Sequence, residues 1–234
     1  MTDFHSHILP CVDDGSDSVQ MSLEMLRRQA EQGVRRVVAT PHFYARHDKP
    51  DRFLARRAGA EACLREAMAR ENGLPGLIMG AEVHYFPGIS HCDILHELTI
   101  GGGRCILIEM PPPPWTENMY RELEGIANYQ HLMPIVAHVD RYIRPLRTYR
   151  IPQRLAEMTL LVQANAEFFL QGRTRKFAMN LLREGRIHVI GTDCHNLSDR
   201  APNLEAAIHE IRRFCGEEAL TGIREHEQMI LTAL

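Results

Sequence analysis

The chain has 234 residues and a net charge of -3, with 27 Lys and Arg against 30 Asp and Glu. This balance argues against a strongly basic nucleic-acid binder. No stretch approaches the roughly 20 apolar residues of a membrane span, so we expect no integral membrane segment.

The six cysteines are scattered, with no C-x-x-C pair, and the first ten residues, MTDFHSHILP, lack the pattern of a signal peptide. We therefore expect reduced thiols and a cytoplasmic protein. The 13 histidines are the unusual feature of the composition.

Short apolar runs alternate with helical patterns along the chain. The runs have the length of buried strands and cover 4–9, 34–40, 76–83, 104–110, 133–139, 159–165 and 187–193. Helices are predicted over 18–32, 52–71, 116–129, 174–184 and 202–215. This alternation predicts an α/β fold with a parallel sheet, either an open doubly wound sheet or a closed barrel. No linker or repeat interrupts it, so we expect one domain over 1–234.

Metal-type ligands stand at nearly every predicted strand end. Parallel barrels gather these ends on one face, where their active sites lie. We therefore expect the following residues to converge: His5, His7, His42, Glu82, Glu109, His138, Asp193 and His195, with Asp13 or Asp14 from the first loop.

Histidine and carboxylate ligands without thiolate favour Mn, Fe or Zn over Mg or Cu(I). His5 and His7 lie two residues apart on a strand, so both can reach one ion. Nine ligands suit two or three ions. Three divalent ions among four carboxylates would leave a charge of about +2, which suits a phosphate dianion. Arg141 and Arg200 follow the last two ligand-bearing strands and are predicted to bind phosphate.

The motifs DFHSHILPCVDDGSDS, VVATPHF, GAEVHY, LIEM, AHVDRY and GTDCHNLSDRAPN resemble one known family over essentially the whole chain. This family comprises the bacterial manganese-dependent protein-tyrosine phosphatases of capsule and exopolysaccharide loci. They belong to the polymerase-and-histidinol-phosphatase (PHP) superfamily. The chain departs from the family's pattern at Asp140, where Glu is usual, and in the four prolines 111–114.

The resemblance implies a distorted (β/α)7 TIM-like barrel of the PHP type with three divalent cations, Mn2+ first, and Fe or Zn as alternatives. His5, His7, Glu82 and Asp193 would hold one cation. Glu82 would bridge to a second, with Glu109 and His138, and Asp14, His42 and His195 would hold the third. The implied partner is a phosphotyrosine protein, the tail of a tyrosine autokinase that controls polysaccharide export, and a homo-oligomer is compatible with this.

The expected reaction is metal-assisted hydrolysis of phosphotyrosine, with Arg141 and Arg200 on the phosphate. His42, His195 or a metal-bound water would serve as general acid, and Phe43 and Tyr44 would stack on the tyrosyl ring. His84 and Tyr85 would line the pocket or pack in the core, and Trp115 would anchor its loop or form the substrate rim.

Four alternatives stay open at this point. Cys194 to Arg200 reads C-x5-R, as in cysteine-dependent tyrosine phosphatases, although that chemistry needs a depressed thiol pKa and Asp193 would raise it. A PHP-type phosphatase of histidinol phosphate or another small phosphomonoester would have the same metal site. An amidohydrolase-like metallohydrolase would share the first H-x-H and the last Asp, and a non-catalytic metal-binding module would share the whole ligand set.

Overall fold

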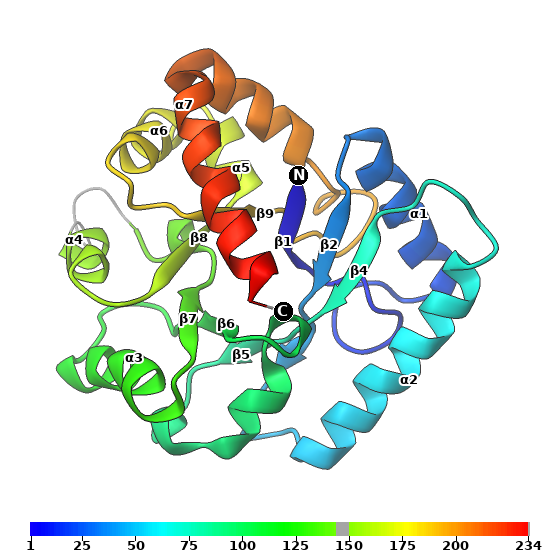
Figure 1. The fold of residues 1–234 in the computed structure, drawn as a ribbon, viewed down its shortest axis with the longest axis horizontal. Helices are drawn as coiled ribbons and strands as arrows, with labels where there is room; N and C mark the ends of the chain where they lie inside the picture. The colour runs from blue at the N-terminus through cyan, green and yellow to red at the C-terminus, as the bar shows by residue number, and fades with distance from the viewer. Residues whose placement is uncertain (144–149, 234) are drawn as a thin grey trace.

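A computed structural model describes residues 1–143 and 150–233. Its strands surround a common axis and its helices lie outside them (Figure 1). The strands are β1 Thr2–Ser6, β2 Arg36–Ala39, β3 His42–Phe43, β4 Gly76–Met79, β5 Glu82–His84, β6 Cys105–Glu109, β7 Met133–Val136, β8 Leu161–Asn165 and β9 Val189–Gly191. The helices are α1 Val19–Glu31, α2 Pro50–Met68, α3 Glu117–Gln130, α4 Arg150–Ala156, α5 Ala166–Leu170, α6 Arg175–Arg183 and α7 Leu204–Thr232. Short 3-10 turns cover Ile89–His91, Asp93–Leu98, Ile100–Gly102 and Val139–Arg141.

All strand pairs are parallel, in the orders β1-β2-β4 and β3-β5-β6-β7-β8-β9. The sheet curls until its two ends meet. Ser6 forms a bridge with Cys194, and the His7 N–H donates to the Cys194 carbonyl over 2.9 Å. The carboxyl ends of the strands therefore open on the same side, as expected for a parallel α/β fold.

The strands enclose a small apolar core of their own. Its buried members include Phe4, Val38, Leu107, Ile135 and Val189. Ile230 of α7 belongs to the same cluster, and α7 crosses the end of the strands in Figure 1. The last turns of this helix therefore cover the inner core at the amino ends of the strands.

Helix α7 is longer than the sequence pattern indicated. The prediction stopped at residue 215, but the helix continues to Thr232 beyond a kink at Gly216, where φ is 81°. Glycine adopts this left-handed conformation at little cost, so the two halves remain joined. Helices α4 and α5 were not predicted, because seven and five residues are too few to display a helical period.

Helix α1 has the ends that its sequence indicates. The Ser18 hydroxyl accepts a hydrogen bond from the Met21 N–H over 3.2 Å, and Gly33 follows the helix with a φ of 73°. These ends fix where the chain enters β2.

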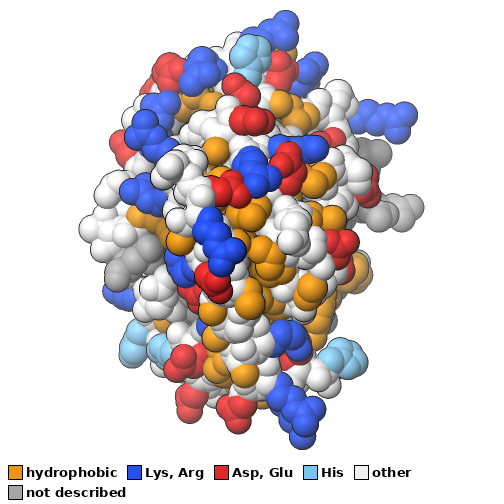
Figure 2. Space-filling view, turned by 90° about the vertical axis from the view of Figure 1, so that its right-hand side faces the viewer, with side chains coloured by type: hydrophobic (Ala, Val, Ile, Leu, Met, Phe, Trp, Pro, Cys, Tyr) orange, Lys and Arg blue, Asp and Glu red, His pale blue; other side chains and the backbone are white. Residues whose placement is uncertain are grey.

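The outer faces of α1 and α2 carry charges of both signs. Arg27 pairs with Glu24 on α1 and Arg65 pairs with Glu61 on α2, each about one helical turn apart. Figure 2 shows the side of the molecule that carries these helices, with Lys and Arg atoms interspersed among Asp and Glu atoms. Over residues 1–143 and 150–233, no helix combines the length and the apolar character that a membrane crossing requires.

Candidate metal centre

The deepest part of the site lies between β1, β5 and the end of β9. The Nε2 atoms of His5 and His7 are 3.1 Å apart, because residues two apart on β1 face the same side. Glu82 Oε2 lies 3.1 Å from the first nitrogen and 3.2 Å from the second. Asp193 Oδ1 lies 3.5 Å from both. Four donor atoms from three strand ends thus face one point.

Glu82 also faces a second group. Its Oε1 lies 2.6 Å from His138 Nε2, and Glu109 Oε1 lies 3.6 Å from the same nitrogen. Glu109 Oε2 in turn accepts from His84 Nδ1 over 2.9 Å. The two oxygens of Glu82 therefore connect neighbouring groups, an arrangement suited to a bridging carboxylate.

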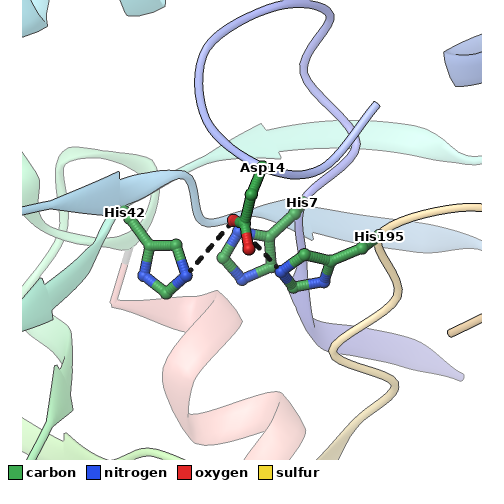
Figure 3. Close-up of side chains that lie close together, drawn as sticks. All are labelled: His7, Asp14, His42 and His195. Carbon is green, nitrogen blue, oxygen red and sulfur yellow. Dashed lines mark ion pairs between the residues drawn. The ribbon is translucent and has the colours of Figure 1, made fainter. Parts of the chain in front are cut away.

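The third group lies nearest the solvent. Asp14 Oδ1 is 3.6 Å from His42 Nε2 and 3.4 Å from His195 Nε2. Figure 3 shows Asp14 above these two rings, with His7 between them. The Asp14 side chain is 67% exposed, whereas that of His195 is 3% exposed. This group therefore forms the outer edge of the centre.

The donor atoms fit divalent cations better than they fit one another. Within the described part of the chain, six buried side-chain atoms have no hydrogen-bond partner, and four of them belong to the centre: Glu82 Oε2, His42 Nδ1, His138 Nδ1 and His195 Nε2. His42 Nδ1 lies only 3.0 Å from Glu82 Oε2, yet the two are not aligned for a hydrogen bond. Buried polar atoms are rarely left in this way. A cation between nitrogen and oxygen lone pairs would satisfy Glu82 Oε2, His42 Nδ1 and His195 Nε2.

The charges of the site also call for cations. Asp14, Glu82, Glu109 and Asp193 approach the same histidines, and carboxylates packed this closely repel one another. Three overlapping sets of donor atoms meet the distances of an ion site: His7, Asp14, His42 and His195; His5, His7 and Asp193; and His42, Glu82 and Glu109.

The pKa values reflect this crowding. Burial lowers the pKa of His5 and of His7, but the surrounding carboxylates outweigh it and raise both pKa values. Burial likewise opposes ionisation of Glu82, yet the facing histidines hold its pKa well below the usual range. Burial, followed by the nearby His7, lowers the pKa of His195 to about 4. Cations compete with protons for such nitrogens, so their binding releases protons.

The structure separates the roles of Asp13 and Asp14, which their spacing left open. Asp13 Oδ2 accepts hydrogen bonds from His7 Nδ1 over 2.7 Å and from the His42 N–H over 2.9 Å. Its Oδ1 accepts from the Gly15 N–H over 3.0 Å. Asp13 therefore orients two candidate ligands, while Asp14 faces the centre itself. A Cβ on Gly15 would lie 2.2 Å from the His7 carbonyl oxygen, so only glycine fits there.

Two residues of β8 support the centre and were missed by the sequence analysis. Gln163 Oε1 accepts from the His138 N–H over 2.6 Å and from His5 Nδ1 over 3.2 Å. Gln163 Nε2 donates to Asn165 Oδ1 over 3.0 Å, and Asn165 Nδ2 donates to Asp193 Oδ2 over 3.1 Å. Two polar residues at alternate positions of an apolar strand were the signal available in the sequence.

Asp140, in the 3-10 turn after β7, also belongs to this support. Its Oδ1 accepts from the Asn165 N–H over 2.9 Å, and burial raises its pKa. The side chain therefore braces the loop after β7 against β8.

Backbone strain helps to aim two ligands. His138 and Asp193 have φ values of 29° and 54°, in a region that residues with a Cβ rarely adopt. Such strain is typical of functional sites and persists only where the surroundings enforce it. Here both residues follow a strand, and their side chains face Glu82 and the histidines of β1.

Arg141 and Arg200 lie at the rim. Arg200 Nη2 donates to Asp193 Oδ1 over 2.8 Å, and Arg141 Nη2 donates to Asp193 Oδ2. Their side chains are 35% and 40% exposed, against 3% for Asp193. Both guanidinium groups therefore reach from solvent to the edge of the centre.

The structure corrects the expectation for Phe43. This residue is 1% exposed and packs against Phe53 with ring centroids 5.1 Å apart, so it does not face the substrate side. Alternation along β3 turns His42 inward and its neighbour outward. Tyr44 is at the rim, with its ring 5.1 Å from that of His42 and 5.4 Å from that of His84.

The C-x5-R alternative does not fit the structure. Cys194 is fully buried, its pKa is raised by burial and then by Asp3, and its Sγ accepts a hydrogen bond from Gln29 Nε2 over 3.6 Å. A nucleophilic thiol needs exposure and a lowered pKa.

Trp115 anchors its loop, because its Nε1 donates to the Pro111 carbonyl over 2.7 Å.

Known proteins resemble this chain over nearly its whole length. Tyrosine-protein phosphatase YwqE of Bacillus subtilis (strain 168) is 26% identical over 240 residues, which cover 99% of this chain and 91% of YwqE. Tyrosine-protein phosphatase CpsB of Streptococcus pneumoniae is 29% identical over 241 residues, covering 92% and 91%.

The fold matches that of a crystal structure from the work on YwqE of Bacillus subtilis and CpsB of Streptococcus pneumoniae, which are described as unique metal-dependent tyrosine phosphatases. The TM-score is 0.88 at 24% identity, over 100% of this chain and 95% of the other. The family described as capsular polysaccharide synthesis, CpsB/CapC, matches residues 1–231. The chain belongs to the CpsB/CapC family.

Proposed function

We propose that this protein is a metal-dependent phosphatase that hydrolyses phosphotyrosine on protein. The observation that carries the proposal is the set of nitrogen and oxygen donors in three adjoining groups beneath two rim arginines. The names of YwqE and CpsB as tyrosine-protein phosphatases support this substrate. The partner we propose is the tail of a tyrosine autokinase that controls polysaccharide export.

We assign three divalent cations to the centre, Mn2+ first, with Fe or Zn as alternatives. The proposed ligand sets are His5, His7, Glu82 and Asp193; Glu82, Glu109 and His138; and Asp14, His42 and His195. Cations held there would lower the pKa of a water molecule and offset the charge of the phosphate oxygens.

The two arginines bind and orient the phosphate. Each guanidinium now pairs with Asp193, and a phosphate dianion offers it oxygens of stronger charge at the same rim. His42 and His195 stand beside Asp14 at the outer edge, where one of them, or a water molecule held by the cations, would pass a proton to the leaving tyrosinate oxygen. Tyr44 offers a flat surface to the tyrosyl ring.

We also propose how the fold is counted and where the protein works. β2 and β3 are separated by two residues, as are β4 and β5, so each pair counts as one strand of a distorted seven-stranded barrel in a single domain over 1–234. The six free cysteines suit the reducing cytoplasm.

The test is phosphate release from a phosphotyrosine peptide by protein stripped with a chelator, with and without added Mn2+. We expect release to return with Mn2+ and to survive Cys194→Ala. A folded protein that releases no phosphate from the peptide with Mn2+, Fe2+ or Zn2+ would contradict the proposal. If the protein hydrolysed histidinol phosphate or another small phosphomonoester but not the phosphotyrosine peptide, its substrates would be small phosphomonoesters.

A further inference from the structure

A cavity of about 620 Å³ lies beside the metal centre. It is formed where the chain leaves β3, β5 and β6, together with the start of α3. Its lining includes Tyr44, Arg46, His84, Phe86, Pro111 and Met119. Cavities of this size accommodate small ligands or a few side chains.

The cavity and the centre share a wall. The Tyr44 ring lies 5.1 Å from the His42 ring, and His84 Nδ1 donates to Glu109 Oε2 over 2.9 Å. Tyr44 and His84 also face each other at 5.4 Å. When the phosphate of a substrate lies in the centre and its tyrosyl ring lies against Tyr44 and His84, the adjoining polypeptide lies directly over the cavity.

The lining combines an apolar interior with a cationic edge. Phe86, Pro111 and Met119 supply carbon surface, and none is needed to hold a ligand of the centre. Arg46 is exposed, and no carboxylate of the described residues lies within 4.0 Å of its guanidinium. Most surface arginines of α1 and α2 have such a partner, as Arg27 has in Glu71. The Arg46 guanidinium and the apolar side chains of the cavity therefore suit a peptide in which an apolar residue stands near an acidic one.

We propose that this cavity binds the segment of the substrate polypeptide next to the phosphotyrosine. One large apolar side chain enters between Phe86 and Met119, and a neighbouring Asp or Glu pairs with Arg46. This proposal depends on the phosphatase activity proposed above, and it specifies which peptide segments the enzyme prefers next to the phosphotyrosine. Small aryl phosphates do not reach the cavity. The cavity therefore adds specificity for the sequence around the phosphotyrosine of a protein substrate and leaves the chemical step unchanged.

The test uses four peptides that carry a non-hydrolysable difluoromethylphosphonate in place of phosphotyrosine. They differ in two flanking positions, with Phe or Ala at one and Glu or Gln at the other. Fluorescence anisotropy with Mn2+-loaded protein gives the Kd of each. We expect the peptide with Phe and Glu to bind at least about tenfold more tightly than the one with Ala and Gln, a difference typical of one anchored side chain.

The variants assign each preference to a residue. Phe86→Ala removes the preference for Phe and leaves that for Glu, while Phe86→Leu retains most of the first. Arg46→Glu abolishes the preference for Glu and leaves that for Phe. Arg70→Glu makes the same charge change at an exposed position just after α2, away from the cavity, and alters neither preference. Turnover of p-nitrophenyl phosphate stays at the wild-type level in all four variants.

Equal Kd values for the four peptides would overturn the inference, as would preferences that survive both Phe86→Ala and Arg46→Glu. If the phosphotyrosine peptide is hydrolysed but no preference is found, only the inference fails. If the preferences are present but neither phosphotyrosine peptide nor p-nitrophenyl phosphate is hydrolysed, the proposed function fails and the peptide-binding cavity remains.

Discussion

His7 Nδ1 donates a hydrogen bond of 2.7 Å to Asp13 Oδ2, and this contact turns the opposite nitrogen of the ring toward Glu82. The carboxylate thereby fixes the tautomer of the histidine and increases the basicity of its free nitrogen. Partners of this kind, one step removed from the metal, are a recurrent part of metal sites.

Asp13→Asn removes this fixed charge and keeps the size of the side chain. We expect the affinity for Mn2+ to fall about ten- to hundredfold, because the His7 ring loses its preferred tautomer. Calorimetric titration of chelator-stripped protein with Mn2+ measures the change. Asp14→Asn is the comparison, and it should remove a direct ligand and lower the number of bound ions. An unchanged Mn2+ affinity in Asp13→Asn would show that the hydrogen bond has no such role.

Arg141→Met and Arg200→Met test the rim. Each variant loses a charged donor to phosphate, so we expect kcat/KM for p-nitrophenyl phosphate to fall about ten- to hundredfold. The content of bound metal, measured by elemental analysis, should stay the same, since neither residue is a proposed ligand. Arg154→Met removes an arginine that pairs with Glu117 on the outer surface and should leave kcat/KM unchanged. A similar loss in all three variants would argue against phosphate binding by the rim arginines.

Gly191→Ala tests the close approach of β9 to β1. An added Cβ would lie 2.4 Å from the Cβ of His5, so the two strands must separate. We expect the free energy of unfolding to fall by about 1–3 kcal/mol, together with a loss of metal affinity. Gly222→Ala, in α7 with no atom within 4 Å of the new Cβ, should instead raise stability by about 0.5–1 kcal/mol. Urea unfolding of both variants gives these values, and equal effects would refute the steric argument.

His188 lies at the amino end of β9, away from the centre, and predicts a pH dependence of stability. Burial, followed by the nearby His226, lowers its pKa to about 4, and its Nδ1 accepts from the Val162 N–H over 2.9 Å. The unfolded chain binds this proton more tightly, with a pKa near 6.5. The contribution of His188 to stability is therefore complete above about pH 6.5 and is lost as the pH falls toward 4.

His188→Asn keeps an acceptor near the position of Nδ1 and does not titrate. We expect the urea midpoint of this variant to fall less than that of the wild type between pH 7 and pH 4.5. Parallel curves for the two proteins would mean that His188 does not carry the effect.

The parts of the fold that follow from local patterns were predictable from the sequence. Each long apolar run became a strand, because burial on both faces demands continuous apolar residues. The ligands His5, Glu82 and Asp193 could be named because parallel strands end on one side, although their metal roles stay predictions. The role of Asp13 could not be predicted, since it depends on a hydrogen bond across a loop. The position of Phe43 was wrong because alternation on a two-residue strand leaves no pattern to read. Gln163 and Asn165 act only through neighbours brought close by the complete sheet.

The closure of the sheet between its first and last strands has a consequence for biosynthesis. The ribosome synthesises β1 first, whereas its neighbour β9 and Cys194, which forms the bridge with Ser6, follow more than 180 residues later. Until then a growing chain keeps one edge of β1 unpaired, and such distant pairing makes folding slow. His5 and His7 meet Asp193 only after this step. We therefore expect cations to stabilise the closed sheet rather than guide its assembly.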